Sequence, residues 1–199
     1  MKKTLTFLAI ALVLCVGFKP LSAQDTNRWD ARLGVGLFGA QDVVGLLTIG
    51  LGEFVDGETV SSSGFLPLIT PSLEMSYTCN EYISVGAQLT LGFASEEYEY
   101  YNTTQKGNSF MLYPTLMANL KVNYLKKNNF SMYGLFGLGA TNYFVVNNDP
   151  YNSTNLIYLV TPMFNFYPLC FSTNKDNGFY MEVGWGSKGW LNLGWEMKL

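Results

Sequence analysis

The chain contains no histidine, and it is poor in charge. Only 14% of its 199 residues are charged, whereas an ordinary soluble domain carries about 25%. Histidine is the commonest proton-transfer side chain and the commonest metal ligand, so its absence argues against most hydrolytic and metal-dependent chemistry. The low charge indicates that something other than water covers part of the surface.

Long apolar runs are also missing, except at the N-terminus. Two lysines follow Met1, residues 5–16 are almost wholly apolar, and Leu21-Ser22-Ala23 resembles a cleavage site, which together indicate a secretory signal peptide. We therefore expect residues 1–23 to be removed and residues 24–199 to form the mature domain. The apolar run is too short for a membrane-spanning helix, which needs about 20 residues. An uncleaved N-terminal anchor is the alternative.

Removal of the leader makes the domain more acidic. Three lysines leave with residues 1–23 and no acid does, so 9 Lys plus Arg face 15 Asp plus Glu, a net charge of −6. Nucleic acid is not expected as a partner, because it requires clustered Lys and Arg. In lipid, only helices and closed barrels satisfy every backbone polar group. Low charge without a spanning helix therefore favours a closed transmembrane barrel.

Apolar and polar residues alternate along much of the chain. From Ile83 to Ala94 the alternation is unbroken, and it returns from Trp190 to Leu199. A period of two is typical of a strand with two unlike faces. Eight segments can be traced in this way: Trp29–Ala40, Phe65–Cys79, Ile83–Ala94, Phe110–Tyr124, Phe130–Val145, Leu156–Cys170, Phe179–Gly186 and Trp190–Leu199. We predict an all-β, eight-stranded antiparallel up-and-down transmembrane β-barrel; Pro162 and Pro168 make the sixth segment the least regular.

An even number of strands returns both termini to one side, which we expect to be the periplasm together with the short links after Cys79, Leu125 and Phe171. Segments 41–64, 97–109 and 146–154 should project outward, with a short outer turn at Ser187-Lys188-Gly189. Within the first of these, residues 43–54 have apolar side chains at steps of three and four. This predicts a short helix that acts as a lid or lateral rest at the outer mouth; the alternative is an extended hairpin or a separate strand.

Alternation does not say which face points outward. A soluble, lipocalin-like barrel would place its apolar face around a small apolar ligand. Three observations favour lipid outside the barrel. The charge is low, most strands reach the roughly 9 to 11 residues of a tilted span, and aromatic residues gather at strand ends. The aromatic residues assigned to the inner interface are Trp29, Tyr77, Tyr82, Tyr124, Phe130 and Trp195, and those assigned to the outer one are Phe38, Phe65, Phe110, Phe144, Tyr158 and Trp185.

With the apolar face outside, charged side chains point into the lumen. An eight-stranded barrel is only wide enough to be filled by its own side chains, so we expect a charge-paired plug. Its predicted members are Arg32, Glu74, Lys121, Glu182 and Glu196. The first, second and eighth strands become neighbours on closure, which favours a pair between Arg32 and Glu74 or Glu196. A narrow ion path or proton relay is the alternative role.

No residue pattern predicts a catalytic, cofactor or metal site. Acidic residues 96, 97 and 99 are most simply a solvated loop tip. A Tyr-rich and Asn-rich composition is typical of adaptable contacts to proteins or glycans, and the predicted recognition residues of the outer loops are Tyr98, Tyr100, Tyr101, Asn148 and Tyr151. The two cysteines of the mature chain, Cys79 and Cys170, end non-neighbouring strands and are predicted to be free rather than disulfide-bonded.

The leader, the eight alternating segments and the terminal strand resemble the small outer-membrane β-barrel proteins of Gram-negative bacteria, of the OmpA and OmpX type, and especially the barrel-domain proteins common in the Bacteroides group. The resemblance implies residence in the cell outer membrane, contact with its lipid and with the barrel-assembly machinery, and a non-enzymatic role in envelope integrity or surface adhesion. The family's final strand commonly ends in an aromatic residue, whereas this chain ends in Leu199, four residues after Trp195.

Overall fold

The computed structural model describes residues 28–40, 61–65, 69–99, 106–127, 130–148, 155–173 and 177–199, and these residues contain nine strands. Their bounds are β1 Arg28–Leu37, β2 Ser61–Phe65, β3 Ile69–Thr78, β4 Ile83–Glu99, β5 Lys106–Lys127, β6 Phe130–Asn148, β7 Asn155–Ser172, β8 Asn177–Trp185 and β9 Leu191–Lys198. Within this part of the chain, no helix is long and apolar enough to cross a membrane.

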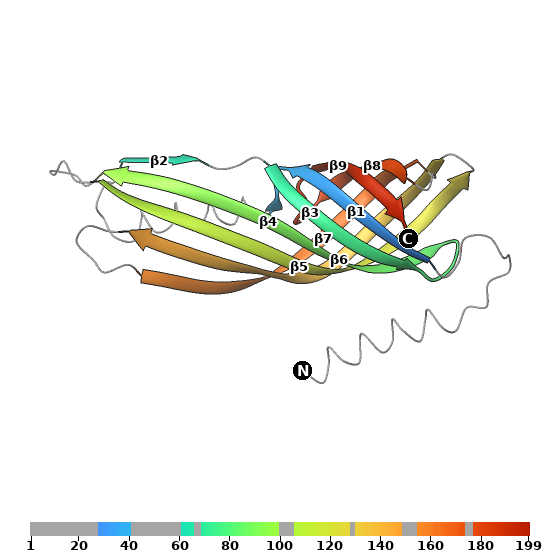
Figure 1. Ribbon diagram of the computed structural model, residues 1–199, viewed down its shortest axis with the longest axis horizontal. Helices are drawn as coiled ribbons and strands as arrows, with labels where there is room; N and C mark the ends of the chain where they lie inside the picture. The colour runs from blue at the N-terminus through green and yellow to red at the C-terminus, as the bar shows by residue number, and fades with distance from the viewer. Residues whose placement is uncertain are drawn as a thin grey trace, which may run out of the picture.

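All strands except β2 form one closed antiparallel barrel (Figure 1). Each strand pairs with its neighbours in chain order, β1 pairs with both β3 and β9, and β4 pairs with β5. The predicted eight-stranded up-and-down barrel is therefore confirmed. Closure leaves no sheet edge at the level where all eight strands run side by side, which is the condition for satisfying the backbone in lipid.

The apolar face of the barrel points outward, as predicted. Leu116 is 61% exposed and Leu138 is 66% exposed, while Arg32 in the lumen is fully buried. The alternative of a soluble barrel with an apolar interior is thereby excluded, because such a barrel would bury the leucines and expose the charges.

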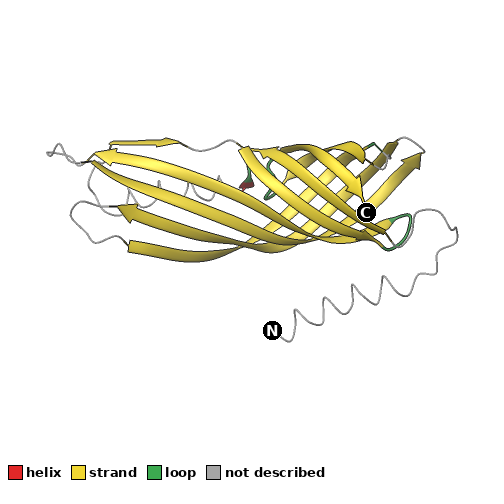
Figure 2. Cartoon of the chain, in the orientation of Figure 1, coloured by secondary structure: helices red, strands yellow, loops and turns green. Residues whose placement is uncertain are grey.

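The strands differ in length by a factor of about two. β1, β3, β8 and β9 have 8 to 10 residues, which matches a tilted span, whereas β4 to β7 have 17 to 22. The four long strands therefore continue past the short ones as a projecting sheet, at the end of the barrel away from the C-terminus (Figure 2). Because longer loops mark the cell-surface end of such barrels, we call this the outer end.

The projecting sheet corrects the predicted outer loops. Residues 97–99, 106–109 and 146–148 were expected to be loop, but they belong to β4, β5 and β6. Outside the lipid a strand no longer needs an apolar outer face, so the alternation ends before the hydrogen-bonded ladder does. The predicted strand Phe65–Cys79 is likewise two elements: Phe65 lies in β2, which pairs with Ser95–Glu99 at the edge of the projecting part of β4, and β3 begins at Ile69.

Both prolines of β7 lie where a ladder donor is not required. Pro168 lies between Phe166 and Leu169, where the pairing with β8 shifts register. Pro162 lies in the stretch of β7 that pairs with β6 and, among the described strands, with no other. Proline lacks the backbone N–H, so a register shift and an unpaired edge are the positions that tolerate it. The predicted leader and the predicted helix at residues 43–54 lie outside the described residues.

The outward face supports a test of membrane depth on one strand. Leu138 and Val146 both point outward from β6, but Leu138 lies within the barrel and Val146 on the projecting sheet. We expect Leu138→Lys to lower the free energy of unfolding in phospholipid vesicles by about 2–4 kcal/mol and Val146→Lys by about 0–1 kcal/mol. Urea unfolding of the two variants measures both values. Equal losses would contradict the placement of the projecting sheet outside the lipid.

Candidate functional site

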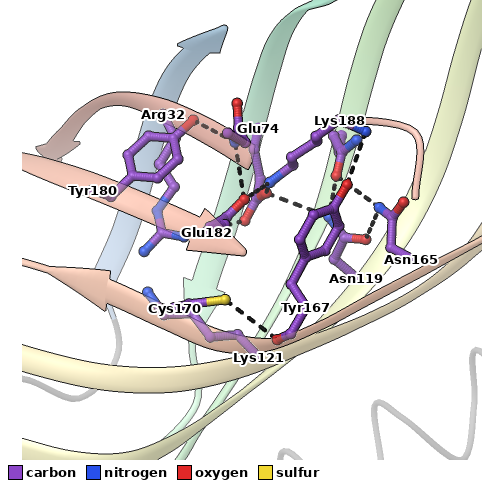
Figure 3. A network of polar contacts seen from close by, with 12 residues as sticks. Arg32, Glu74, Asn119, Lys121, Asn165, Tyr167, Cys170, Tyr180, Glu182 and Lys188 are labelled. Atoms are coloured by element: carbon purple, nitrogen blue, oxygen red, sulfur yellow. Dashed lines mark hydrogen bonds and ion pairs between the residues drawn. The ribbon is translucent and has the colours of Figure 1, made fainter. Parts of the chain in front are cut away.

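The lumen is centred on Arg32, which contacts three carboxylates. Two of them, Glu74 and Glu182, are labelled beside it in Figure 3. Its Nη2 lies 2.9 Å from Glu196 Oε2, and its Nη1 lies 3.3 Å from Glu182 Oε1 and 3.8 Å from Glu74 Oε1. The strand register explains two of these contacts, because Arg32 on β1 lies directly opposite Glu74 on β3 and Glu196 on β9. Directly opposite residues have their Cβ atoms only about 5 Å apart.

A second cation, Lys188, lies in the lumen on the far side of the same carboxylates. Its Nζ donates hydrogen bonds to Glu74 Oε2 and to Glu182 Oε2, the latter at 2.9 Å. Sequence analysis placed Lys188 in a short outer turn and missed this role. The turn is instead folded inward, and both Ser187 and Lys188 are fully buried. The available signal was the shortness of the turn, since a turn of this length cannot project, together with a positive charge next to an acidic lumen.

Hydrogen bonds from two strands, β4 and β7, hold the β8–β9 turn inside the barrel. The Lys188 backbone N–H donates to Tyr167 Oη at 3.1 Å, and the Ser187 N–H donates to Asn165 Oδ1 at 2.8 Å. Gln88 Nε2 on β4 donates to Ser187 Oγ at 2.8 Å. The turn therefore lies buried in the lumen, and we refer to residues 186–189 as the plug turn.

Two glycines make room for the plug turn. A Cβ atom built at Gly36 on β1 would lie 1.4 Å from the Lys188 carbonyl oxygen, so any side chain there would displace the turn. Gly189 has a φ of +93°, a backbone conformation that other residues rarely adopt. The approach of the turn thus explains the glycine at position 36, whereas at Gly34 a Cβ atom would lie 2.1 Å from Tyr180 Oη.

The third cation, Lys121, lies at the edge of the cluster. Its Nζ is 4.0 Å from Glu196 Oε1 and 4.3 Å from the centre of the Tyr133 ring. The structure places all five predicted lumen residues in the barrel interior, and with Lys188 they make three cations and three carboxylates. A buried cluster of this kind is tolerated only when its charges balance and its remaining lone pairs are hydrogen-bonded.

Neutral side chains supply those remaining hydrogen bonds. Tyr133 Oη donates to Glu182 Oε1 at 2.9 Å, Ser172 Oγ donates to Glu196 Oε2 at 2.6 Å, and Asn192 Nδ2 donates to Glu182 Oε2 at 2.9 Å. Arg32 also lies over the rings of Tyr133 and Tyr180, at 4.9 and 5.0 Å from the ring centres. Sequence analysis did not assign these tyrosines to the lumen, because tyrosine is equally common at the lipid interface.

Toward the outer end the lumen becomes less charged. An amide layer comes first, in which Asn119 Nδ2 and Asn165 Nδ2 both donate to Gln88 Oε1, at 2.7 and 3.0 Å. Beyond it lies a buried apolar cluster on the inner face of the projecting sheet: Ala94, Met111, Tyr113 and Tyr143. The described interior is therefore lined in turn by charged, amide and apolar side chains.

The predicted recognition residues are only partly described. Tyr98 and Asn148 belong to strands β4 and β6 rather than to loops, which corrects that part of the prediction. Tyr100, Tyr101 and Tyr151 lie outside the described residues. Cys79 and Cys170 are both buried and neither is in a disulfide bond, as predicted, and Cys170 Sγ donates to the Tyr167 carbonyl oxygen at 3.3 Å.

A closed barrel with an apolar exterior and a charge-paired interior defines a membrane-embedded β-barrel of the bacterial outer membrane. The chain belongs to the family of the outer membrane protein beta-barrel domain, whose family model matches residues 8–195. It is thus an outer-membrane protein with transmembrane strands, as the sequence predicted.

Comparison with known proteins adds one remote likeness. Solved structures that match include Ail, the attachment invasion locus protein of Yersinia pestis, crystallised with the heparin analogue sucrose octasulfate. The two chains share 10% identity with a TM-score of 0.44, over 85% of this chain and 95% of Ail. So remote a likeness carries no argument about function. No curated protein matches the chain.

The lumen cluster predicts a large difference between two arginines of β1. Arg32→Ala leaves three buried carboxylates with two cations, and we expect it to lower the free energy of unfolding by about 3–5 kcal/mol. Arg28→Ala is the matched control, because Arg28 lies partly exposed at the end of the same strand and its ion pair is with a single carboxylate, Asp30, so its loss should cost clearly less than that of Arg32. Urea unfolding in vesicles compares them. Similar losses from both variants would show that the cluster is not the centre of lumen stability.

Proposed function

We propose that this protein is a non-enzymatic, non-conducting outer-membrane barrel that stabilises the cell envelope and presents its outer end for recognition. The main support for a closed, non-conducting lumen is the plug turn, in which Lys188 forms ion pairs with both Glu74 and Glu182. A fully buried turn that is hydrogen-bonded to β4 and β7 supports a lumen without a continuous water path at that level.

The charge balance supports a structural role for Arg32, Glu74, Lys121, Glu182 and Glu196. A conducting path needs charged groups that water reaches, whereas Arg32, Glu182 and Lys188 are fully buried and paired with one another. Separating such a pair would leave uncompensated buried charges, at a cost of several kcal/mol. The alternative of an ion path or proton relay is therefore disfavoured on energetic grounds.

Recognition is assigned to the outer end, where the projecting sheet stands clear of the lipid. The sequence at this end combines tyrosine and asparagine, a composition typical of adaptable polar contacts. The residues that we propose to contact a surface protein or glycan are Tyr98, Tyr100, Tyr101, Asn148 and Tyr151. The family match to a barrel domain and the lack of histidine both support a non-enzymatic role. The proposal also includes removal of residues 1–23 by cleavage after Ala23 and insertion of the mature domain by the barrel-assembly machinery.

Conductance measurements test the closed lumen. Purified full-length protein in planar lipid bilayers should show no channel steps, and Arg32→Ala should show none either, because the plug turn stays in place while thermal stability falls. Steady conductance in the wild type, or altered conductance in Arg32→Ala with unchanged stability, would establish an ion path instead. Heat-modifiable gel mobility of each sample serves as the control for a folded barrel.

The envelope role predicts a phenotype in cells. Deletion of the gene should increase uptake of an apolar fluorescent dye by intact cells, because the outer membrane loses a rigid component. Complementation with the wild type or with Arg28→Ala should restore the barrier, whereas Arg32→Ala should restore it only in part. Unchanged dye uptake in the deletion strain would refute the envelope role and leave recognition as the function to test.

A further inference from the structure

The outward-facing side of the projecting sheet is apolar and exposed. Beyond Phe166, where β8 joins β7, strands β5, β6 and β7 continue together, and their outward-facing side chains alternate with buried ones such as Met111 and Tyr143. We call the large outward-facing residues at this level the outer wall: Phe110, Leu112, Phe144, Val146, Tyr158 and Val160. All of them except Phe144 are exposed, from 38% for Val146 to 57% for Tyr158.

Cross-strand pairing makes the outer wall one continuous surface. Phe110 lies opposite Val146, and Phe144 lies opposite Leu112 on one side and Tyr158 on the other. The rings of Phe144 and Tyr158 are 5.2 Å apart between their centres. A contiguous apolar patch of this kind, exposed on a folded protein, marks a site of contact with another protein or with a membrane.

The hydrocarbon of the membrane does not reach the outer wall. A tilted span takes about 9 to 11 residues, whereas β5, β6 and β7 have 22, 19 and 18. Their lipid-facing part carries Leu116 and Leu138, and the wall continues directly from it toward the outer end. A strand outside the lipid needs no apolar outer face, so the wall indicates a further contact.

The outer wall is also uncharged. Residues 107–120 of β5, 131–148 of β6 and 155–172 of β7 contain no Asp, Glu, Lys or Arg. The hydroxyl group of Tyr158, the only one in the wall, donates to Asn142 Oδ1 at 2.8 Å. Two identical walls can therefore meet without like-charge repulsion and without burying an unpaired hydroxyl group.

A second copy of the barrel presents the matching surface. Because the wall rises directly from the lipid-facing surface, a partner that covers it down to the membrane stands in the same membrane. Copies of the chain are inserted in the same direction, so their walls lie at the same height and meet by lateral diffusion. A twofold axis along the membrane normal brings one wall onto the other, as in the self-complementary interface of a dimer. Strands tilted by about 40° then cross at about 80°, which is the orthogonal arrangement of two sheets packed face to face.

We propose that the outer wall is a self-association surface, through which two copies of this chain pack face to face above the lipid. The aromatic residues Phe110, Phe144 and Tyr158 provide the buried centre of the contact, since aromatic side chains contribute strongly to interfaces. Self-association goes beyond the envelope and recognition roles proposed above, and it depends on neither of them.

Energy transfer between labelled copies tests the association in a membrane. Full-length protein carries a donor or an acceptor dye on Lys127→Cys, an exposed position at the inner end of β5, while Cys79 and Cys170 are buried and do not react in the folded protein. In phospholipid vesicles we expect energy transfer that saturates as the protein-to-lipid ratio rises and that falls when unlabelled protein is added. Random encounters of monomers would give a linear rise without saturation.

Two substitutions at one position of the wall form a matched pair. Val146→Lys places an unpaired charge in the contact and should weaken association by about tenfold or more, whereas Val146→Ile keeps the apolar, β-branched surface and should associate as the wild type. Val146→Lys costs little stability because the residue lies outside the lipid, and heat-modifiable mobility verifies that both variants fold.

Two results would overturn the self-association surface. The first is a linear rise of energy transfer in the wild type, which is expected when a different protein, or nothing, covers the wall. The second is equal association of Val146→Lys and Val146→Ile, which would place the contact on another surface. Conductance and dye uptake measure the roles proposed earlier, so their results are independent of this test.

Discussion

Lipid offers no hydrogen-bond partner to a backbone group, and the fold of this chain follows from that constraint. Every N–H and C=O within the membrane must be satisfied by the protein itself, and a strand can achieve this only with a neighbour on each side. Eight strands meet the condition by closing on themselves, with β1 between β3 and β9. Once the barrel is closed, its apolar face is available to lipid and its polar face is enclosed.

Enclosing a polar face in a narrow barrel creates a second constraint. The charged side chains that turn inward have little water around them, so their charges must compensate one another. Arg32, Lys121 and Lys188 face Glu74, Glu182 and Glu196, and tyrosine, serine and asparagine side chains donate further hydrogen bonds to the carboxylates. The plug turn belongs to this solution, because it brings the cation that two of the carboxylates need. Stability and closure of the lumen thus have the same physical origin.

Outside the lipid, backbone groups can bind water and a strand no longer needs a neighbour on each side. The strands differ in whether they continue beyond that point. β1, β3, β8 and β9 stop near the length of a tilted span, while β4 to β7 continue as a sheet. A sheet that leaves the barrel regains edges. One edge is covered by β2 and carries acids, and the other, on β7, is apolar and free among the described strands. The outward-facing side of the same sheet also leaves the lipid, and it keeps the apolar side chains that we propose to pack against a second copy.

Much of this architecture was accessible without coordinates. Strict alternation from Ile83 to Ala94 predicts a strand with two environments, and the low charge predicts which environment is lipid, because both are local properties of the residues. The cross-strand position of Arg32 between Glu74 and Glu196 follows once strand order and closure are assumed. The extension of β5 and β6 beyond the apolar alternation was missed, because outside the lipid a ladder needs no hydrophobic pattern.

The sequence by itself determined the class of fold, the strands that cross the membrane and five of the six charges in the lumen cluster, since each depends on composition and on a period of two. Tertiary structure alone decided that Lys188 folds into the lumen, that Gly36 makes room for it and that, among the described strands, none pairs with the outer side of the first part of β7. These features depend on distances between residues far apart in the chain, which arise only when the barrel closes with its particular register and unequal strand lengths.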